Sequence, residues 1–205
     1  MKKNTKNALK YLLEFVIVTF GVFLGIYVSE QENKKKIKQE REKSVNYILE
    51  ELNDNKHSLE KAISYHQLIK TQIDSIVPTL NKKDVYEVYW GNEKFKHSQI
   101  KGWSGVRLAN LENTAFEGAK ISGMIQEYKI ELVHDISKIY NQQKKYTEFG
   151  TSILNRMVNI NSSTKIIDVF GSIKLMTGDL LFNEKQLLDR IKKVETNIKT
   201  LRNNN

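Results

Sequence analysis

The apolar residues of this chain fall into one continuous run and several periodic stripes. The run, residues 8–28, reads ALKYLLEFVIVTFGVFLGIYV and is the only long apolar stretch in the sequence. No Gly or Pro occurs in residues 29–77, which are rich in strong helix formers. We therefore expect a single helix that continues from the apolar run into a long polar stretch and stops at Pro78.

Within residues 45–76 a stripe recurs at steps of three and four, as on the core-facing side of a bundle helix or along a coiled-coil seam. The stripe consists of Val45, Ile48, Leu52, Asn55, Leu59, Ala62, His66, Ile69, Ile73 and Ile76. Asn55 and His66 occupy its two polar positions. Before Val45 the stripe is charged, so residues 29–44 are expected to form a charged helical stalk in solvent.

Four further helical segments are expected after Pro78, one of them the apolar piece over residues 166–176. One is expected from about Leu108 to Gly123, where Gly supplies a left-handed C-terminal residue. A long one over residues 126–159 carries the stripe Leu132, Ile136, Ile139, Gln143, Tyr146, Gly150, Ile153 and Met157. After an apolar piece over residues 166–176 and a turn at residues 177–179, a last helix is expected to begin at Asn183 and Glu184. Its stripe is Leu187, Ile191, Val194, Ile198 and Leu201.

The segment at residues 81–106 has a different character, because it is rich in aromatic residues and punctuated by Gly. It is expected to form a short irregular or hairpin insert. The residue types that dominate protein interfaces gather here, which makes this segment the candidate partner surface. An equally available interpretation is that these aromatic side chains cap the bundle core. The candidates are Tyr86, Tyr89, Trp90, Phe95 and Trp103.

The predicted fold class is all-α, with an N-terminal transmembrane helix continuing into a long helix that packs in an antiparallel helical bundle. The predicted division is a cytoplasmic tail at 1–7, a transmembrane helix at 8–28, the stalk at 29–44 and the helical bundle domain at 45–202.

The apolar run reaches about the 20 residues that a helix needs to cross a bilayer, provided that Lys10 extends its ammonium group to the lipid headgroups. A cleaved signal peptide and a buried helix of a soluble protein are the alternatives. The residues at the end of the run, GIYVSEQ (25–31), contain no A-x-A-like pair of small residues for cleavage. An uncleaved anchor is therefore the favoured interpretation.

One face of this helix is patterned. Its residues follow one another at steps of four and three: Glu14, Val18, Gly21, Gly25 and Val28. Gly21 and Gly25 have the small-x-x-x-small spacing that lets two membrane helices approach closely. Three roles for Glu14 stay open: an interfacial side chain beside Lys10, a contact with a partner helix, and proton handling.

The basic residues around the run bear on topology. Lys2, Lys3, Lys6 and Lys10 lie at its N-terminal side without any acidic residue before Glu14, whereas the Lys and Arg residues after the run alternate with Glu. Short basic tails stay in the cytoplasm and long C-terminal domains translocate largely regardless of charge. We expect a bacterial inner-membrane protein with a periplasmic C-terminal domain, although the larger count of basic residues after the run opposes this orientation.

The composition excludes more than it identifies. The formal charge of +9 attracts anionic partners, but no stripe of Arg interleaved with aromatic residues and no nucleic-acid-binding module occurs, so we expect no nucleic-acid partner. The chain has no Cys, which excludes disulfides and thiolate chemistry. G-x-S-x-G, Gly-rich phosphate-loop and H-E-x-x-H motifs are all missing. We therefore expect no enzyme activity, cofactor, metal or small-molecule substrate.

Two histidines nevertheless require an interpretation. Glu131 and His134 have the E-x-x-H spacing that forms half of a di-iron site in helical bundles, but a second copy is missing, so a solvated pair is favoured. His66 lies on the apolar stripe of the first long helix. We expect it to be a hydrogen-bonded seam residue rather than a ligand.

The N-terminal segment resembles the opening of a family of uncharacterised bacterial single-pass membrane proteins. Glu14, a β-branched run, Gly21 and Gly25 carry this resemblance, together with Asn113 to Glu117, Ser122-Gly123, Leu132 and Tyr140. The family's Trp is absent, with Gln31 near its place. The resemblance implies a membrane-anchored helical domain of unknown function and supplies no catalytic residues.

The sequence thus favours a structural or accessory subunit of an envelope membrane complex. It would associate through its transmembrane helix, as a homo-oligomer or with another membrane protein, and would contact membrane lipid. The alternative is a sensor or transport-coupled subunit in which Glu14 titrates or pairs with a partner. A third hypothesis, a small ligand in the bundle near Trp90, Trp103 and Tyr128, has no motif in its support.

Overall fold

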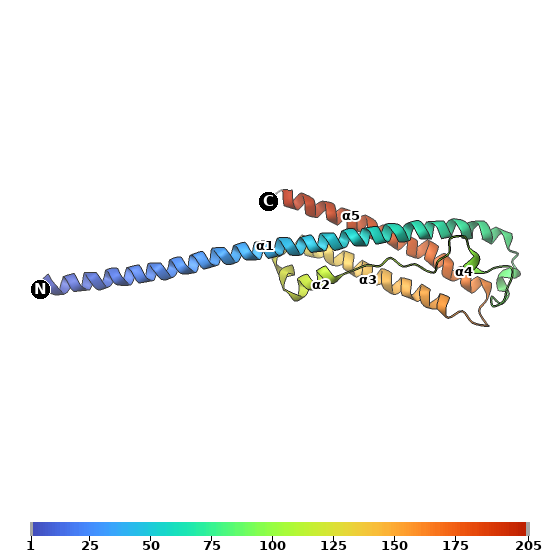
Figure 1. Cartoon of the computed structure of the whole chain (residues 1–205), viewed down its shortest axis with the longest axis horizontal. Helices are drawn as coiled ribbons and strands as arrows, with labels where there is room; N and C mark the ends of the chain where they lie inside the picture. The colour runs from blue at the N-terminus through green and yellow to red at the C-terminus, as the bar shows by residue number, and fades with distance from the viewer. Residues whose placement is uncertain (1, 204–205) are drawn as a thin grey trace.

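The computed structural model describes the backbone of residues 2–203 and the side chains of residues 10–198 and 200. Figure 1 shows a long helix whose second half belongs to a helical bundle and whose first half projects from it alone. In chain order, the elements are α1 (Lys2–Ile76), η1 (Val77–Thr79), η2 (Asp84–Tyr86), η3 (His97–Gln99), α2 (Thr114–Ile121), η4 (Met124–Glu127), α3 (Ile130–Val158), α4 (Ile166–Leu175), η5 (Met176–Leu180) and α5 (Leu181–Asn203). The all-α prediction is confirmed, and the described residues contain no strand.

The predicted stripe of α1 forms one wall of the core. From Val45 to Ile73 every member of the stripe is buried, including Asn55 and His66, and Ile76 is half-buried. All side chains of residues 29–40 are exposed, so burial begins with the bundle. The helix ends at Ile76, and Pro78 lies in the 3₁₀ turn that follows, as the sequence predicts.

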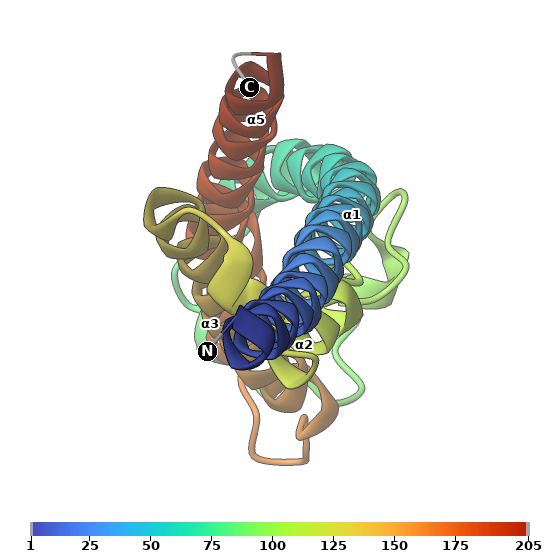
Figure 2. The ribbon, with the colours of Figure 1, turned by 90° about the vertical axis from the view of Figure 1, so that its left-hand side faces the viewer.

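The three long helices do not all alternate in direction. Figures 1 and 2 show α1 and α3 running the same way, with α5 antiparallel to both. This arrangement requires a connection that returns along the whole bundle between α1 and α3. Residues 80–113 provide it. This mostly non-helical stretch, here called the return segment, lies along the bundle (Figure 1).

The helix expected from about Leu108 begins only at Thr114, so this part of the prediction is wrong. Residues 106–113 form no regular secondary structure, and side chains of the bundle bind their backbone. The N–H of Ala109 donates to the Tyr146 hydroxyl at 2.8 Å, and the N–H of Glu112 donates to Asn55 Oδ1 at 2.8 Å. Gly123 follows the C-cap residue of α2 and has a φ of 77°, which confirms the predicted left-handed residue at the end of this helix.

The insert before this segment is irregular rather than a hairpin. Its alternating residues 85–90 do not pair with each other, and Val88 instead forms an isolated antiparallel bridge with Lys165. Two backbone hydrogen bonds support that bridge, from Tyr89 N–H to the Thr164 carbonyl and from Ile166 N–H to the Glu87 carbonyl. The insert is thereby attached to the start of α4.

The expected turn at residues 177–179 and the helix start at Asn183 are also wrong. α4, the π-helical turn η5 and α5 follow one another without a break from Ile166 to Asn203. The wider π turn places neighbouring residues on the core side together, and it buries Met176, Thr177, Leu180 and Leu181. Glu184 consequently lies inside a helix and faces the core instead of opening a helix at the surface.

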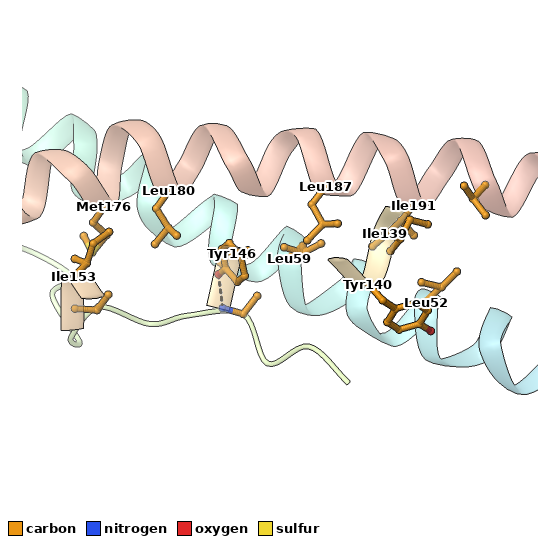
Figure 3. Packing of buried hydrophobic residues seen from close by; sticks show 14 of the residues in the cluster. Leu52, Leu59, Ile139, Tyr140, Tyr146, Ile153, Met176, Leu180, Leu187 and Ile191 are labelled. Carbon is orange, nitrogen blue, oxygen red and sulfur yellow. Dashed lines mark hydrogen bonds between the residues drawn. The ribbon is translucent and has the colours of Figure 1, made fainter. Parts of the chain in front are cut away.

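The core runs the length of the bundle between α1, α3 and α5. Figure 3 shows Leu59 of α1, Ile139 of α3 and Leu187 of α5 converging on it, together with Tyr146 and its hydrogen bond to the return segment. The stripes predicted for α3 and α5 supply these contacts. Leu201, the last member of the α5 stripe, lies outside the residues whose side chains the structure describes.

Candidate functional sites

The N-terminal part of α1 is uncovered. α1 is long and apolar enough to cross a membrane, and none of its most apolar window is buried by the rest of the protein. Large hydrophobic side chains from Tyr11 to Val28 are exposed on all sides of the helix. A soluble protein would bury such a helix, because exposed apolar surface of this extent is unfavourable in water.

The predicted packing face lies within this segment. Glu14, Val18, Gly21, Gly25 and Val28 are all exposed. A Cβ atom added at Gly21 or Gly25 would meet no atom within 4 Å, so another helix can approach the backbone there. Lys10 Nζ lies 3.9 Å from Glu14 Oε1, one helical turn away, and both side chains are exposed. Glu14 thus has a counter-charge on its own helix, as the interfacial interpretation expects.

The candidate partner surface at residues 86–103 divides into two groups. Phe95 is buried and stacks on Phe170 of α4, with 4.2 Å between ring centroids. Tyr89 and Trp103 are half-buried against the core. Tyr86 and Trp90 are exposed by 60% and 69%, respectively. The aromatic residues therefore serve both interpretations: three pack on the bundle, and two stay available to a partner.

His97 holds the packed group together. Its Nδ1 accepts a hydrogen bond from the Tyr89 hydroxyl at 2.6 Å, and its ring contacts Trp103 edge-on at 5.2 Å between centroids. The backbone N–H of His97 donates to the same hydroxyl at 3.3 Å, which leaves the Tyr89 proton for Nδ1. Burial lowers the pKa of His97, since a charged imidazolium loses hydration there.

The most completely buried polar group joins α1, α3, α5 and the return segment. His66 and Glu184 are both 0% exposed, and His66 Nδ1 lies 2.9 Å from Glu184 Oε2. His66 Nε2 lies 2.8 Å from the Val106 carbonyl, which only accepts, so Nε2 carries a proton. The Tyr146 hydroxyl accepts from Ala109 N–H and donates to Glu184 Oε1 at 2.9 Å. One proton therefore lies between Nδ1 and Oε2, and every polar atom of the group is satisfied.

This group is suited to a structural role rather than to chemistry on a ligand. It is buried from solvent, and each of its side-chain polar atoms has a hydrogen-bond partner. Burial, and then the neighbouring Glu184, raise the pKa of Tyr146, so the phenol stays protonated and keeps donating. The expectation that His66 is a hydrogen-bonded seam residue is confirmed.

A second polar group joins α1, α2 and α3 nearer to the stalk. Glu51 accepts from the Tyr140 hydroxyl at 2.5 Å and from the backbone N–H of Ala115 at 2.7 Å, at the first turn of α2. Burial, followed by Glu51, raises the pKa of Tyr140. Asn55 binds both backbone groups of Glu112, since Nδ2 donates to its carbonyl at 2.7 Å. The position of α2 is thus set from α1.

Sequence reasoning missed Glu51 and Glu184 as core residues. A signal was present, because Glu184 continues the α5 stripe backwards at steps of three and four through Leu187. Glu51 similarly stands three residues after Ile48 and four before Asn55. The sequence alone places Glu184 in the first turn of a helix and assigns Glu51 no role, since an ionised Glu is rarely buried without a partner and the partners come from distant segments.

Glu131 and His134 of the E-x-x-H spacing are both exposed at the start of α3. Within the described part of the chain, no group of three or more His, Cys, Asp or Glu side chains is arranged to hold a metal ion.

Comparisons with protein-family models, with curated proteins and with solved structures find no match to this chain. The resemblance of residues 14–25 and 113–140 to a family of single-pass membrane proteins therefore stays a prediction.

Proposed function

We propose that this protein is a single-pass membrane protein, anchored by residues 8–28, that acts as a non-enzymatic structural or accessory subunit of a bacterial envelope complex. The observation that supports it most is the helix of residues 10–28, which exposes apolar side chains on every side while the bundle beyond Val45 has a complete core of its own. A bilayer is the environment in which such a helix is stable.

A signal sequence would present a similar apolar helix at the N-terminus. The anchor interpretation has two supports: the lack of a small-residue cleavage site after Val28, and the unbroken passage of α1 from the apolar segment into the bundle. Determining the N-terminal sequence of the protein purified from membranes distinguishes an uncleaved anchor from a cleaved signal sequence. Retention of residues 8–28 supports the anchor, and a start after Val28 contradicts it.

The membrane helix associates with a second copy or with another membrane protein through the Gly21–Gly25 face. This part of the proposal is supported by the open backbone at both glycines, which no side chain of the described protein covers. In lipid, close packing of such small residues is the main source of helix–helix attraction, because lipid chains are as apolar as leucine.

The test replaces these glycines in the full chain. Gly21→Ile and Gly25→Ile push an approaching helix away from the backbone, so we expect the assembly to weaken. Phe23→Ile is the matched control, since Phe23 lies two residues from each glycine and about 200° around the helix from them. Crosslinking and light scattering in detergent measure the assembly. An unchanged size for both glycine variants would contradict pairing through this face.

Glu14 bears on the alternative, a sensor or transport-coupled subunit. Its ion pair with Lys10 supports an interfacial role, because that contact already provides a counter-charge. We therefore expect Glu14→Gln to keep both assembly and cellular function. Loss of function with intact assembly would favour the alternative.

The proposed location is the bacterial inner membrane, with the bundle in the periplasm. Single Cys substitutions can test this orientation, because the natural chain contains no Cys. A Cys at exposed Val158 should react in intact spheroplasts with a reagent that does not cross membranes. Reaction only after lysis would place the bundle in the cytoplasm.

A further inference from the structure

The end of the bundle nearest the apolar segment differs from the rest of its surface. A groove of about 740 Å³ opens there between α1, the start of α3 and the last turns of α5. Val45, Leu132 and Ile198 supply apolar lining, and Lys38, Arg41 and Lys129 supply basic groups. Two carboxylates, Glu42 and Glu127, also line it, so its basic groups exceed its acidic ones by one.

Two large aliphatic side chains are exposed at the two ends of the connection between α2 and α3, which contributes Glu127, Tyr128 and Lys129 to this groove. Ile121, at the end of α2, is 86% exposed, the highest value among the large hydrophobic side chains that the structure describes. Ile130, the first residue of α3, is 73% exposed. Each follows a lysine in sequence, Lys120 and Lys129. Figure 2, viewed from the side of the N-terminus, shows α2 and the loop that follows it at the near end of the bundle.

The position of this loop along α1 is fixed by a contact. The hydroxyls of Ser44 and Tyr128 lie 2.5 Å apart, which attaches the loop to α1 at the level of Ser44. Ser44 stands 16 residues beyond Val28, about 24 Å along the helix, and Lys38 about 15 Å. The headgroup layer itself adds about 5–8 Å to each side of the hydrocarbon. Membrane helices tilt by about 20° on average and by up to about 40°, and a tilt toward the bundle side brings this end closer to the headgroups.

We propose that this end of the bundle is a second lipid contact that docks on anionic headgroups of the membrane that holds α1. Ile121 and Ile130 enter the headgroup region, and Lys38, Arg41 and Lys129 face the lipid phosphates. This proposal rests on the proposed membrane anchor. Its consequence is a tilted α1 with the bundle against the bilayer, instead of an upright stalk with the bundle far from it.

Lipid is the occupant that these observations favour. The surface faces the bilayer that the same chain is proposed to cross, so lipid is present there at very high local concentration. Exposed aliphatic side chains beside lysines match the two parts of a lipid interface, because the apolar groups enter its boundary and the cations meet its phosphates. Lys35 and Lys36 are exposed on the stalk, and they add positive charge between the membrane segment and the bundle.

The experiment uses the full chain with one Cys, at Ile121, Ile130 or Val158, labelled with an environment-sensitive fluorophore. Val158 is the matched control, because it is 72% exposed but ends α3 at the opposite end of the bundle. The protein is reconstituted in vesicles of phosphatidylcholine with or without phosphatidylglycerol, each carrying a lipid-attached quencher. We expect strong quenching at Ile121→Cys and Ile130→Cys in the anionic vesicles and little at Val158→Cys.

Two further measurements make the result specific. Raising the salt concentration from 0.1 M to 1 M shortens the screening length from about 10 Å to about 3 Å and should release the labelled end. Replacing Lys38, Arg41 and Lys129 together by Gln should lower the docking equilibrium about a hundredfold, since each basic residue near an anionic surface contributes about 1 kcal/mol. Thermal unfolding should change little, because the side chains of Lys38 and Lys129 are exposed.

Flotation of the unlabelled protein with vesicles separates this proposal from the anchor. If the chain floats but the labels at residues 121 and 130 are quenched no more than the label at 158, the docking proposal is overturned and the anchor stands. A chain that does not float overturns both. A partner protein in place of lipid would leave the labels unquenched in pure lipid vesicles, which also counts against docking on lipid.

Discussion

His66 Nδ1 and Glu184 Oε2 lie 2.9 Å apart with neither side chain exposed, although 118 residues separate them in the chain. Their contact joins the long helix that begins in the proposed membrane segment to the last helix of the bundle. Because Tyr146 and Val106 complete the hydrogen bonds of this pair, α3 and the return segment are held in the same group.

Removing one partner should therefore be costly. We expect Glu184→Ala to lower the free energy of unfolding by about 3–5 kcal/mol, since it leaves His66 Nδ1 and the Tyr146 hydroxyl buried without their hydrogen-bond partner. Glu184→Gln should cost about 1 kcal/mol, because an amide can donate to a neutral His66 and still accept from Tyr146. Urea unfolding of the full chain in detergent measures both. Asp74→Asn, which breaks the exposed Lys70–Asp74 pair, is the control and should change stability by less than about 1 kcal/mol.

Stability should also depend on the protonation of His97. Because burial lowers its pKa in the folded protein, the unfolded chain takes up the proton first as the pH falls. The stabilisation is then fully present above the ordinary pKa of 6.5 and is lost as the pH falls from there toward the folded pKa. We expect the midpoint temperature of unfolding to decrease as the pH is lowered from 6.5. The decrease should be smaller in His97→Gln, whose amide oxygen can still accept from Tyr89. An equal fall in both proteins would assign the effect to other groups.

The two groups of aromatic residues near residues 86–103 should respond differently to truncation. Phe95→Ala removes a buried ring that stacks on Phe170, and we expect a loss of about 3–5 kcal/mol. Trp90→Ala removes an exposed side chain and should change stability by less than about 0.5 kcal/mol. If a partner binds this surface, Trp90→Ala should weaken co-purification while the fold stays intact. A large loss of stability from Trp90→Ala would show that the side chain packs on the bundle.

Two glycines offer a matched comparison of helix propensity and packing. Gly171 of α4 has open space around an added Cβ, so Gly171→Ala should stabilise the protein by about 0.5–1 kcal/mol. At Gly150 of α3 an added Cβ would overlap Leu108 Cδ2 and would lie 3.2 Å from its Cγ. Overpacking there costs about 1–3 kcal/mol, which exceeds the gain in helix propensity. We expect Gly150→Ala to be net destabilising by about 1 kcal/mol in urea unfolding. Equal stabilisation by both changes would contradict this close packing.

Local pattern was sufficient to identify the three long helices and the core-facing side of each. The step of three and four from Val45 to Ile76 identified the core face of α1, and the same step identified the core faces of α3 and α5. Pro78 and Gly123 marked two helix ends correctly, because each acts through its own backbone. The apolar segment of residues 8–28 and its Glu–Gly face are likewise properties of the sequence alone.

Only the tertiary structure decided how residues 106–113 and the polar core are arranged. Residues 108–113 can form a helix by local preference, but Tyr146 and Asn55 bind their backbone groups, and the segment is not helical. Glu51 and Glu184 look like surface residues, because burying a carboxylate is unfavourable until tyrosine, histidine or backbone donors are placed around it. Those donors come from segments that lie far apart in the chain, and proximity between such segments is created only when the bundle folds.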